Sequence, residues 1–135
     1  CWAAQLSGAL LAGALARLLV AAPAVAPLQD VGLATLLVSE ALFAFALCYV
    51  VLDHREPGEV LAALTVVAGA ALLDPVAGSA FNPAAAFGQA VAGISEWTTI
   101  WVYLLACPAG GALAGMAAGR VGQAGQASQA RSRSG

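Results

Sequence analysis

The stretch "GSAFNPAAAFGQA" (residues 78–90) places an Asn-Pro pair inside an apolar part of the chain. Asn is a favoured N-cap residue because its side-chain oxygen accepts a free backbone N–H, and Pro is favoured at the first helical position, where its missing N–H costs nothing. The pair therefore predicts a helix that begins at Asn82 or Pro83 and ends near Gly93. Such a helix of about 11 residues is about 16 Å long, which is half the thickness of a bilayer core.

The composition around this stretch is that of a membrane protein. Of the 135 residues, 61% are hydrophobic and 9% are charged, and the mean hydropathy is +0.88, whereas soluble domains contain about 25% charged residues. The charges gather in "DHREPGE" (53–59) and "ARSRSG" (130–135), as in the loops and ends of a multi-pass protein. We therefore expect an all-α integral membrane protein, although the sequence does not say which membrane. Five arginines without lysine form no basic face, which excludes nucleic acid as a partner.

The apolar runs give the expected spans. A bilayer core needs about 20 apolar residues per helix, and runs of that order cover residues 2–22, 31–52 and 97–121. The run over 60–73 is shorter, and the helix over 82–93 crosses only half a bilayer. Together these segments form one transmembrane region, residues 1–121. The low-complexity remainder, residues 122–135, is predicted to be disordered.

The helix start at Asn82 needs a reason to lie within a membrane. A helix end is tolerated there only where it lines a cavity or is buried in protein. Its N-terminus carries roughly half a positive elementary charge, and the Asn82 amide can still donate a hydrogen bond after its oxygen has capped the helix. Such an end repels cations and orients polar neutral molecules. We therefore expect Asn82, Pro83 and Ala84 to face a pore or binding site; a surface loop with an Asn-Pro turn is the alternative.

Few other side chains suggest chemistry. Placing an acidic residue such as Glu40 within an apolar span costs about 2.5 to 3.5 kcal/mol on insertion scales, so it should have a partner. The cysteines at 1, 48 and 107 have no metal-ligand spacing and are predicted to be inert buried thiols. Small residues, including Gly8, Gly13, Gly110 and Gly115, predict close helix packing, unless they only reflect an Ala-rich composition.

The order of these motifs resembles the aquaporin, or major intrinsic protein, family. The matching residues are Gln5, Glu40, Gly78, Asn82-Pro83-Ala84, Phe87-Gly88, Trp101 and Pro108. The resemblance covers helices three to six of that family and implies an aquaporin-like helical bundle with a membrane half-helix. One of the two inverted repeats is represented, together with the helix before it. The chain is therefore expected to be a fragment, or to have its other half supplied by another chain.

The resemblance also implies a function. It implies a passive channel for water or small neutral solutes, without enzymatic activity or cofactor, that lies in a lipid bilayer as a homo-oligomer, a tetramer in the family. Glu40 is then expected to accept hydrogen bonds from the loop before the half-helix, with Gln5 and Gly78 as further structural support. No metal is expected.

The family's selectivity filter departs from its usual pattern here. The matching positions hold Ala70, Ser79 and Ala85, where the family has an aromatic residue or His, a small residue, and an Arg. A filter without this charge and bulk should be wider and less polar. A non-conducting, truncated or degenerate relative with a structural role is the alternative, and Ala85 favours it. A membrane enzyme or ion-coupled transporter would need more intramembrane ionisable groups than Glu40.

Overall fold

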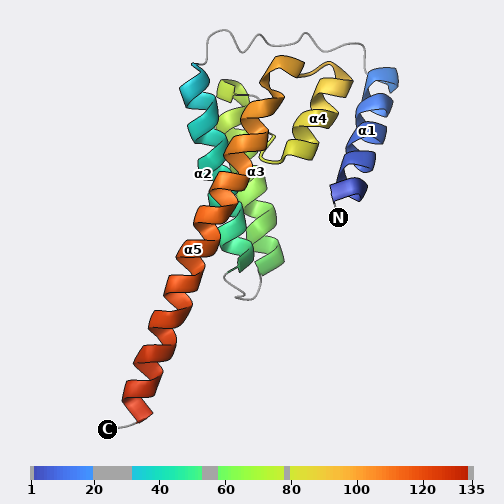
Figure 1. Ribbon diagram of the computed structural model, residues 1–135. Helices are drawn as coiled ribbons and strands as arrows, with labels where there is room; N and C mark the ends of the chain where they lie inside the picture. Colours follow the sequence, from blue (N-terminus) through green and yellow to red (C-terminus); the bar gives the residue numbers. More distant parts are fainter. Residues whose placement is uncertain (1, 20–31, 53–57, 78–79, 134–135) are drawn as a thin grey trace.

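The chain folds into helices that pack side by side, as the computed structural model shows (Figure 1). The structure describes residues 2–19, 32–52, 58–77 and 80–133, and these ranges contain no strand. The elements are α1 (Trp2–Leu19), α2 (Leu33–Leu52), α3 (Gly58–Ala77), α4 (Pro83–Ala92), the short 3₁₀ helix η2 (Trp97–Thr99) and α5 (Ile100–Arg133). The prediction of an all-α fold is confirmed.

Several of the helices fit a membrane. Within the described ranges, three are long and apolar enough to cross one: Trp2–Leu19, Leu33–Leu52 and the continuous segment Trp97–Arg133. The apolar part of α3, Gly58–Leu72, is shorter. Helix α4 has 10 residues, which corresponds to about 15 Å, or half a bilayer core.

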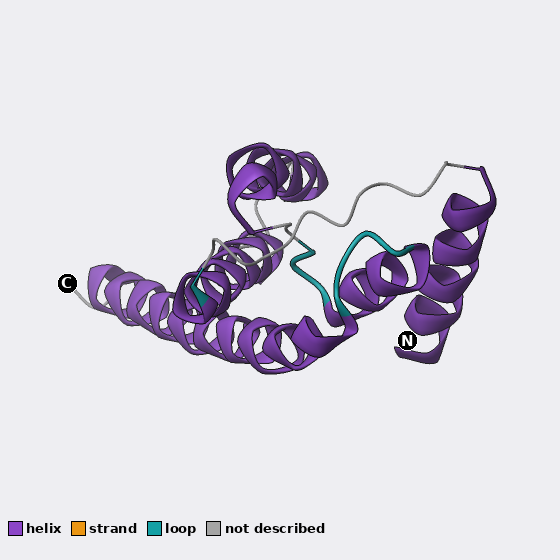
Figure 2. Ribbon diagram, turned by 90° about the horizontal axis from the view of Figure 1, so that it is seen from above, coloured by secondary structure: helices purple, strands orange, loops and turns teal. Residues whose placement is uncertain are grey.

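Helix α4 lies between α1 and the other long helices. Helix α5 packs along α2, and α3 packs on the same α2, while α1 packs against α4. Helix α4 in turn contacts α5. Figures 1 and 2 show α1 beside α4, on the side away from α2 and α3. The half-length helix therefore joins α1 to the rest of the bundle.

Glycines allow the closest helix contacts. A Cβ added at Gly110 of α5 would collide with the Ala41 carbonyl oxygen of α2, and one at Gly13 of α1 would lie 2.5 Å from the Gly88 carbonyl oxygen of α4. At Gly8 and Gly115, in contrast, none of the described residues lies within 4 Å of the added Cβ. The prediction of close packing through small residues is thus confirmed at Gly13 and Gly110 and wrong at the other two.

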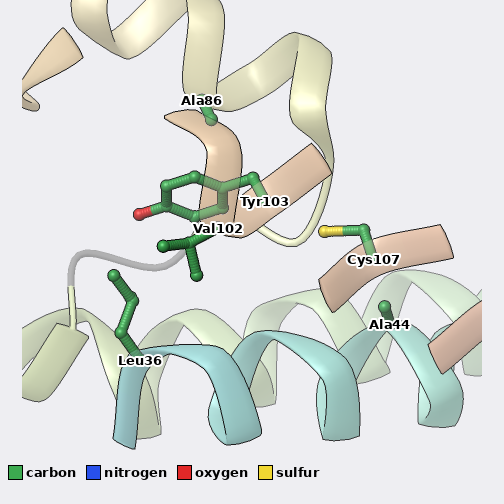
Figure 3. Close-up of a cluster of buried hydrophobic side chains, with 6 residues drawn as sticks. All are labelled: Leu36, Ala44, Ala86, Val102, Tyr103 and Cys107. Atoms are coloured by element: carbon green, nitrogen blue, oxygen red, sulfur yellow. The ribbon is translucent and has the colours of Figure 1, made fainter. Parts of the chain in front are cut away.

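A cluster of buried side chains connects α4 with α2 and α5 (Figure 3). Val102 and Tyr103 of α5 are 0% exposed, as is Ala86 of α4. Cys107 of α5 and two side chains of α2, Leu36 and Ala44, complete the cluster. This core fixes the first turn of α4 against the long helices.

Two helices extend further than the sequence predicts. Helix α3 ends at Ala77, whereas the apolar run predicts an end near residue 73, because helical hydrogen bonding does not require apolar side chains. Helix α5 continues to Arg133, so the prediction of disorder is wrong for residues 122–133. That segment contains no Pro and is rich in Ala, Gln and Arg, which are good helix formers. In Figure 1, α5 extends well past the other helices.

The remaining predicted boundaries agree closely with the structure. Helix α2 ends at Leu52, as predicted, and α1 is described as far as Leu19. The predicted ends of these spans at residues 20–22 and 31 lie outside the described residues, as do residues 134 and 135.

Candidate functional site

Asn82 caps the start of α4. Its backbone is extended, with φ −153° and ψ 128°, and its Oδ1 accepts a hydrogen bond from the backbone N–H of Ala84 at 2.9 Å. Pro83 is the first helical residue, and the Asn82 carbonyl oxygen accepts from Ala86 N at 3.0 Å. Since the side-chain oxygen is used by the cap, the amide Nδ2 is the group that can contact a solute.

The other end of α4 is held by a glycine and an arginine. Gly93 has a left-handed φ of 78°, and its N–H donates to the Ala90 carbonyl oxygen at 3.2 Å. Arg17 of α1 donates from Nη1 to the Val91 carbonyl oxygen at 3.4 Å. A positive charge at a helix C-terminus complements the negative end of the helix dipole. Both ends of the half-length helix are therefore fixed by specific contacts.

Glu40 of α2 binds the loop that leads into α4. Its side chain is 0% exposed. Oε1 accepts from Ala80 N at 3.2 Å and Oε2 accepts from Phe81 N at 2.8 Å, which are the contacts that the resemblance implies. The two carboxylate oxygens thus satisfy two backbone donors just before Asn82. A buried carboxyl group with such partners is far less costly than an unpaired one.

Cys107 is a residue of this site that the sequence does not reveal. Its Sγ lies 3.9 Å from Glu40 Oε2, as a weak thiol donor from α5. The predicted inert thiol is therefore buried, as expected, but it also contacts the carboxyl group. The two residues are 67 positions apart, and no local sequence pattern could have paired them.

Phe81 is the second such residue. Its φ of 52° makes it the one non-glycine residue with positive φ in the described ranges. A non-glycine residue held in this region costs about 1 to 3 kcal/mol. Its ring stacks on Phe43 of α2, with 5.0 Å between ring centroids and 27° between ring planes. Bulky residues at positive φ are rare, so no local pattern predicts one at this position.

Asn82, Pro83 and Ala84 open onto a groove of about 400 Å³. Its walls come from α1, α4 and the first turns of α5, and its other lining residues are Trp2, Gln5, Leu6, Phe87, Ile100 and Leu104. Gln5 is exposed and shares this groove with Asn82. The supporting role expected of Gln5 therefore stays a prediction. The polar side-chain groups among its lining residues are the amides of Gln5 and Asn82 and the indole N–H of Trp2, and none of its lining residues has an ionisable side chain.

The predicted filter positions lie on different helices. Ala85 of α4 is half-buried and lines a second hollow of about 250 Å³ with small residues of α1, including Ala9, Ala12 and Gly13. Ala70 of α3 is also half-buried but does not line that hollow. Ser79, like Gly78, lies outside the described residues. The part of the chain that the structure describes thus contains no closed ring of the three filter positions.

A metal site is not found in the described part of the chain. No group of three or more His, Cys, Asp or Glu side chains there could hold a metal ion. What the described site offers is a helix start, two amides and a buried carboxyl group that binds backbone donors.

Comparison with known proteins gives a consistent result. The model of the family "Major intrinsic protein" matches residues 1–118. The chain is 38% identical over 124 residues to the probable aquaporin TIP4-2 of Oryza sativa subsp. japonica, covering 83% of this chain and 48% of that protein. It is 43% identical over 105 residues to aquaporin TIP4-3 of Zea mays, covering 69% of this chain and 38% of that protein.

A third relative is the probable aquaporin TIP3-2 of Oryza sativa subsp. japonica, which is 39% identical over 127 residues, covering 84% of this chain and 47% of that protein. The chain spans about half the length of the curated relatives it matches, or less. No solved structure matches it significantly. Because the family model covers most of the chain and the apolar helices fit a bilayer, the chain belongs to the major intrinsic protein family of integral membrane channels.

Proposed function

We propose that this chain contributes one half-helix and its surrounding walls to a passive channel for water and small neutral solutes. The observation that carries the proposal is the position of Asn82. It caps a helix of half-membrane length and opens onto an apolar groove shared with Gln5. The names of the aquaporin relatives support the same function.

The groove has the chemistry that a neutral polar solute needs. The Asn82 amide can donate a hydrogen bond, and the N-terminus of α4 supplies a positive potential of roughly half an elementary charge. No acidic side chain lines the groove to offset this potential. A hydrated cation would therefore lose its water shell without a compensating partner, whereas water, urea or glycerol can accept hydrogen bonds from the site.

The small residues at the filter positions suggest the range of solutes. Alanines at 70 and 85 occupy positions at which the family has larger or charged side chains, so we infer an opening wide enough for solutes larger than water. The Cys107 thiol beside Glu40 is buried, and neither residue lines the groove, so we propose no catalytic activity. By resemblance, the complete protein forms a homo-oligomer, a tetramer as in the family.

The test measures passive flux through the full-length protein that contains this chain. Proteoliposomes are exposed to sucrose, urea and glycerol gradients, and volume changes are followed by stopped-flow light scattering. We expect water, urea and glycerol permeabilities above those of empty liposomes, without an increased proton leak. Permeabilities equal to the lipid background for all three would favour the alternative of a non-conducting structural relative. Water flux without urea or glycerol flux would overturn only the wide-filter part of the proposal.

A further inference from the structure

Three elements meet at two aromatic rings and a glycine directly beside the candidate site. The Phe81 ring, in the loop before α4, stacks on the Phe43 ring of α2. Gly69 of α3 lies against both rings: a Cβ added there would be 2.6 Å from Phe43 Cδ1 and 3.0 Å from Phe81 Cε2. We call Phe43, Phe81 and Gly69 the aromatic latch. Only a residue without a side chain lets α3 approach the stacked rings this closely.

The latch also holds a backbone conformation that a phenylalanine rarely adopts. Phe81 has φ 52°, a region that bulky L-residues disfavour. Its N–H donates to Glu40 Oε2 at 2.8 Å, and its ring is held against Phe43. The surrounding contacts, rather than local preference, therefore set the direction in which the chain leaves Phe81.

Two components of the latch are adjacent in sequence to residues of the proposed channel. Asn82, which begins the half-helix, follows Phe81, and the filter position Ala70 follows Gly69 on α3. A shift of Phe81 relative to Gly69 must therefore move Asn82 relative to Ala70. The latch thus links α3 directly to the start of α4.

We propose that Phe43, Phe81 and Gly69 are positioning residues that set the distance between the half-helix start and the α3 side of the filter, and hence the size limit for solutes. This inference rests on the proposed function of Asn82 and Ala70. It adds the residues that decide how far apart the two elements stand, although none of the three needs to touch a solute.

The deciding substitution is Gly69→Ala in the full-length protein. The new Cβ must push α3 away from the stacked rings, so the opening should widen and the ratio of glycerol to water permeability should rise at least about twofold. The matched control is Gly58→Ala, in the same helix, where an added Cβ meets none of the described residues within 4 Å. This control should leave the ratio unchanged and the thermal midpoint unchanged or slightly raised, since Ala is the better helix former.

A second substitution provides the rescue. Phe43→Ala removes both ring carbons, Cδ1 and Cε1, that the methyl group added by Gly69→Ala would meet. The double variant should therefore have a permeability ratio closer to wild type than Gly69→Ala alone. Its loss of thermal midpoint should also be smaller than the sum of the two single losses, since the effects of residues in contact are not additive.

The results separate the latch from the channel proposal. If Gly69→Ala behaves like Gly58→Ala, the proposed positioning role is wrong. It is also wrong if Gly69→Ala lowers the thermal midpoint without changing the permeability ratio, because Gly69 then contributes only to helix packing. If the wild type conducts neither water nor glycerol, the proposed function fails. The contact of Gly69 with the two rings is then tested by the thermal midpoints of the single and double variants alone. If the double variant loses as much as the two single variants together, this contact is wrong as well.

Discussion

The backbone N–H of Phe81 donates a 2.8 Å hydrogen bond to Oε2 of Glu40, a side chain with no exposed surface. This bond joins the middle of α2 to the loop that enters α4. Together with the bond from Ala80 N to Oε1, it explains why an acidic residue is tolerated within an apolar helix. The carboxyl group replaces water as the acceptor for two backbone donors that have no helical partner.

Replacing Glu40 by Gln should destabilise the protein. Gln keeps one accepting oxygen but presents an NH₂ group to the other backbone N–H, which leaves a buried donor unpaired at a cost of about 1 to 3 kcal/mol. We expect a lower thermal midpoint in detergent, measured by tryptophan fluorescence. Glu59→Gln is the matched control, because Glu59 lies exposed in the first turn of α3 and should be neutral. Equal midpoints for Glu40→Gln and the wild type would show that the carboxyl group is not needed.

Two substitutions at Asn82 separate its cap from its role toward solutes. Asn82→Leu removes both the cap acceptor and the amide donor, and loss of an N-cap costs about 0.5 to 2 kcal/mol. Asn82→Asp keeps an acceptor for Ala84 N but replaces the donor with a negative charge. We therefore expect Asn82→Asp to retain the thermal midpoint yet lose cation exclusion, measured as sodium or proton leak in proteoliposomes. Full water flux and an unchanged sodium and proton leak in both variants would show that Asn82 does not act on the permeating solute.

Arginine at position 85 should narrow the channel and add a fixed positive charge. The hollow of about 250 Å³ beside Ala85 offers room for part of the longer side chain. We expect urea and glycerol permeabilities of Ala85→Arg to fall more than its water permeability in stopped-flow measurements. Ala85→Met is the control that adds bulk without charge. A fall in solute permeability that both variants share is therefore due to the narrower opening and not to the charge. An unchanged ratio of solute to water flux in Ala85→Arg would place Ala85 outside the conducting path.

Gly13 should be intolerant of even a methyl group. An added Cβ would lie 2.5 Å from the Gly88 carbonyl oxygen and 3.0 Å from Val91 Cβ, and overpacking of this kind costs about 1 to 3 kcal/mol. Gly13→Ala should thus lower the thermal midpoint by separating α1 from α4. Gly8→Ala, in the same helix but with none of the described residues within 4 Å of the added Cβ, should be neutral or slightly stabilising, since Ala is the better helix former. A similar effect of both substitutions would argue against the close contact.

The sequence by itself determined the class of fold and the start of α4. Long apolar runs must become helices in a bilayer because backbone groups have no water to bind there, so α1, α2 and α5 follow from composition. The Asn-Pro pair and Gly93 are local signals whose effect depends on a few neighbouring atoms. For that reason they mark the bounds of α4 within a residue. The helical continuation of α5 does not follow from the same rules, because low complexity is also typical of disordered segments.

Only the tertiary structure decided which side chains meet. The cost of burying Glu40 predicts that this residue has a partner. Its contact with Cys107, however, depends on how α5 lies along α2. The positive φ of Phe81 runs against its local preference and persists because Phe43 and Glu40 hold it. In the sequence, Gly69 does not differ from other glycines in Ala-rich helices, and only the structure shows that the two rings lie against it. Such contacts join residues far apart in the chain, and local patterns contain no information on them.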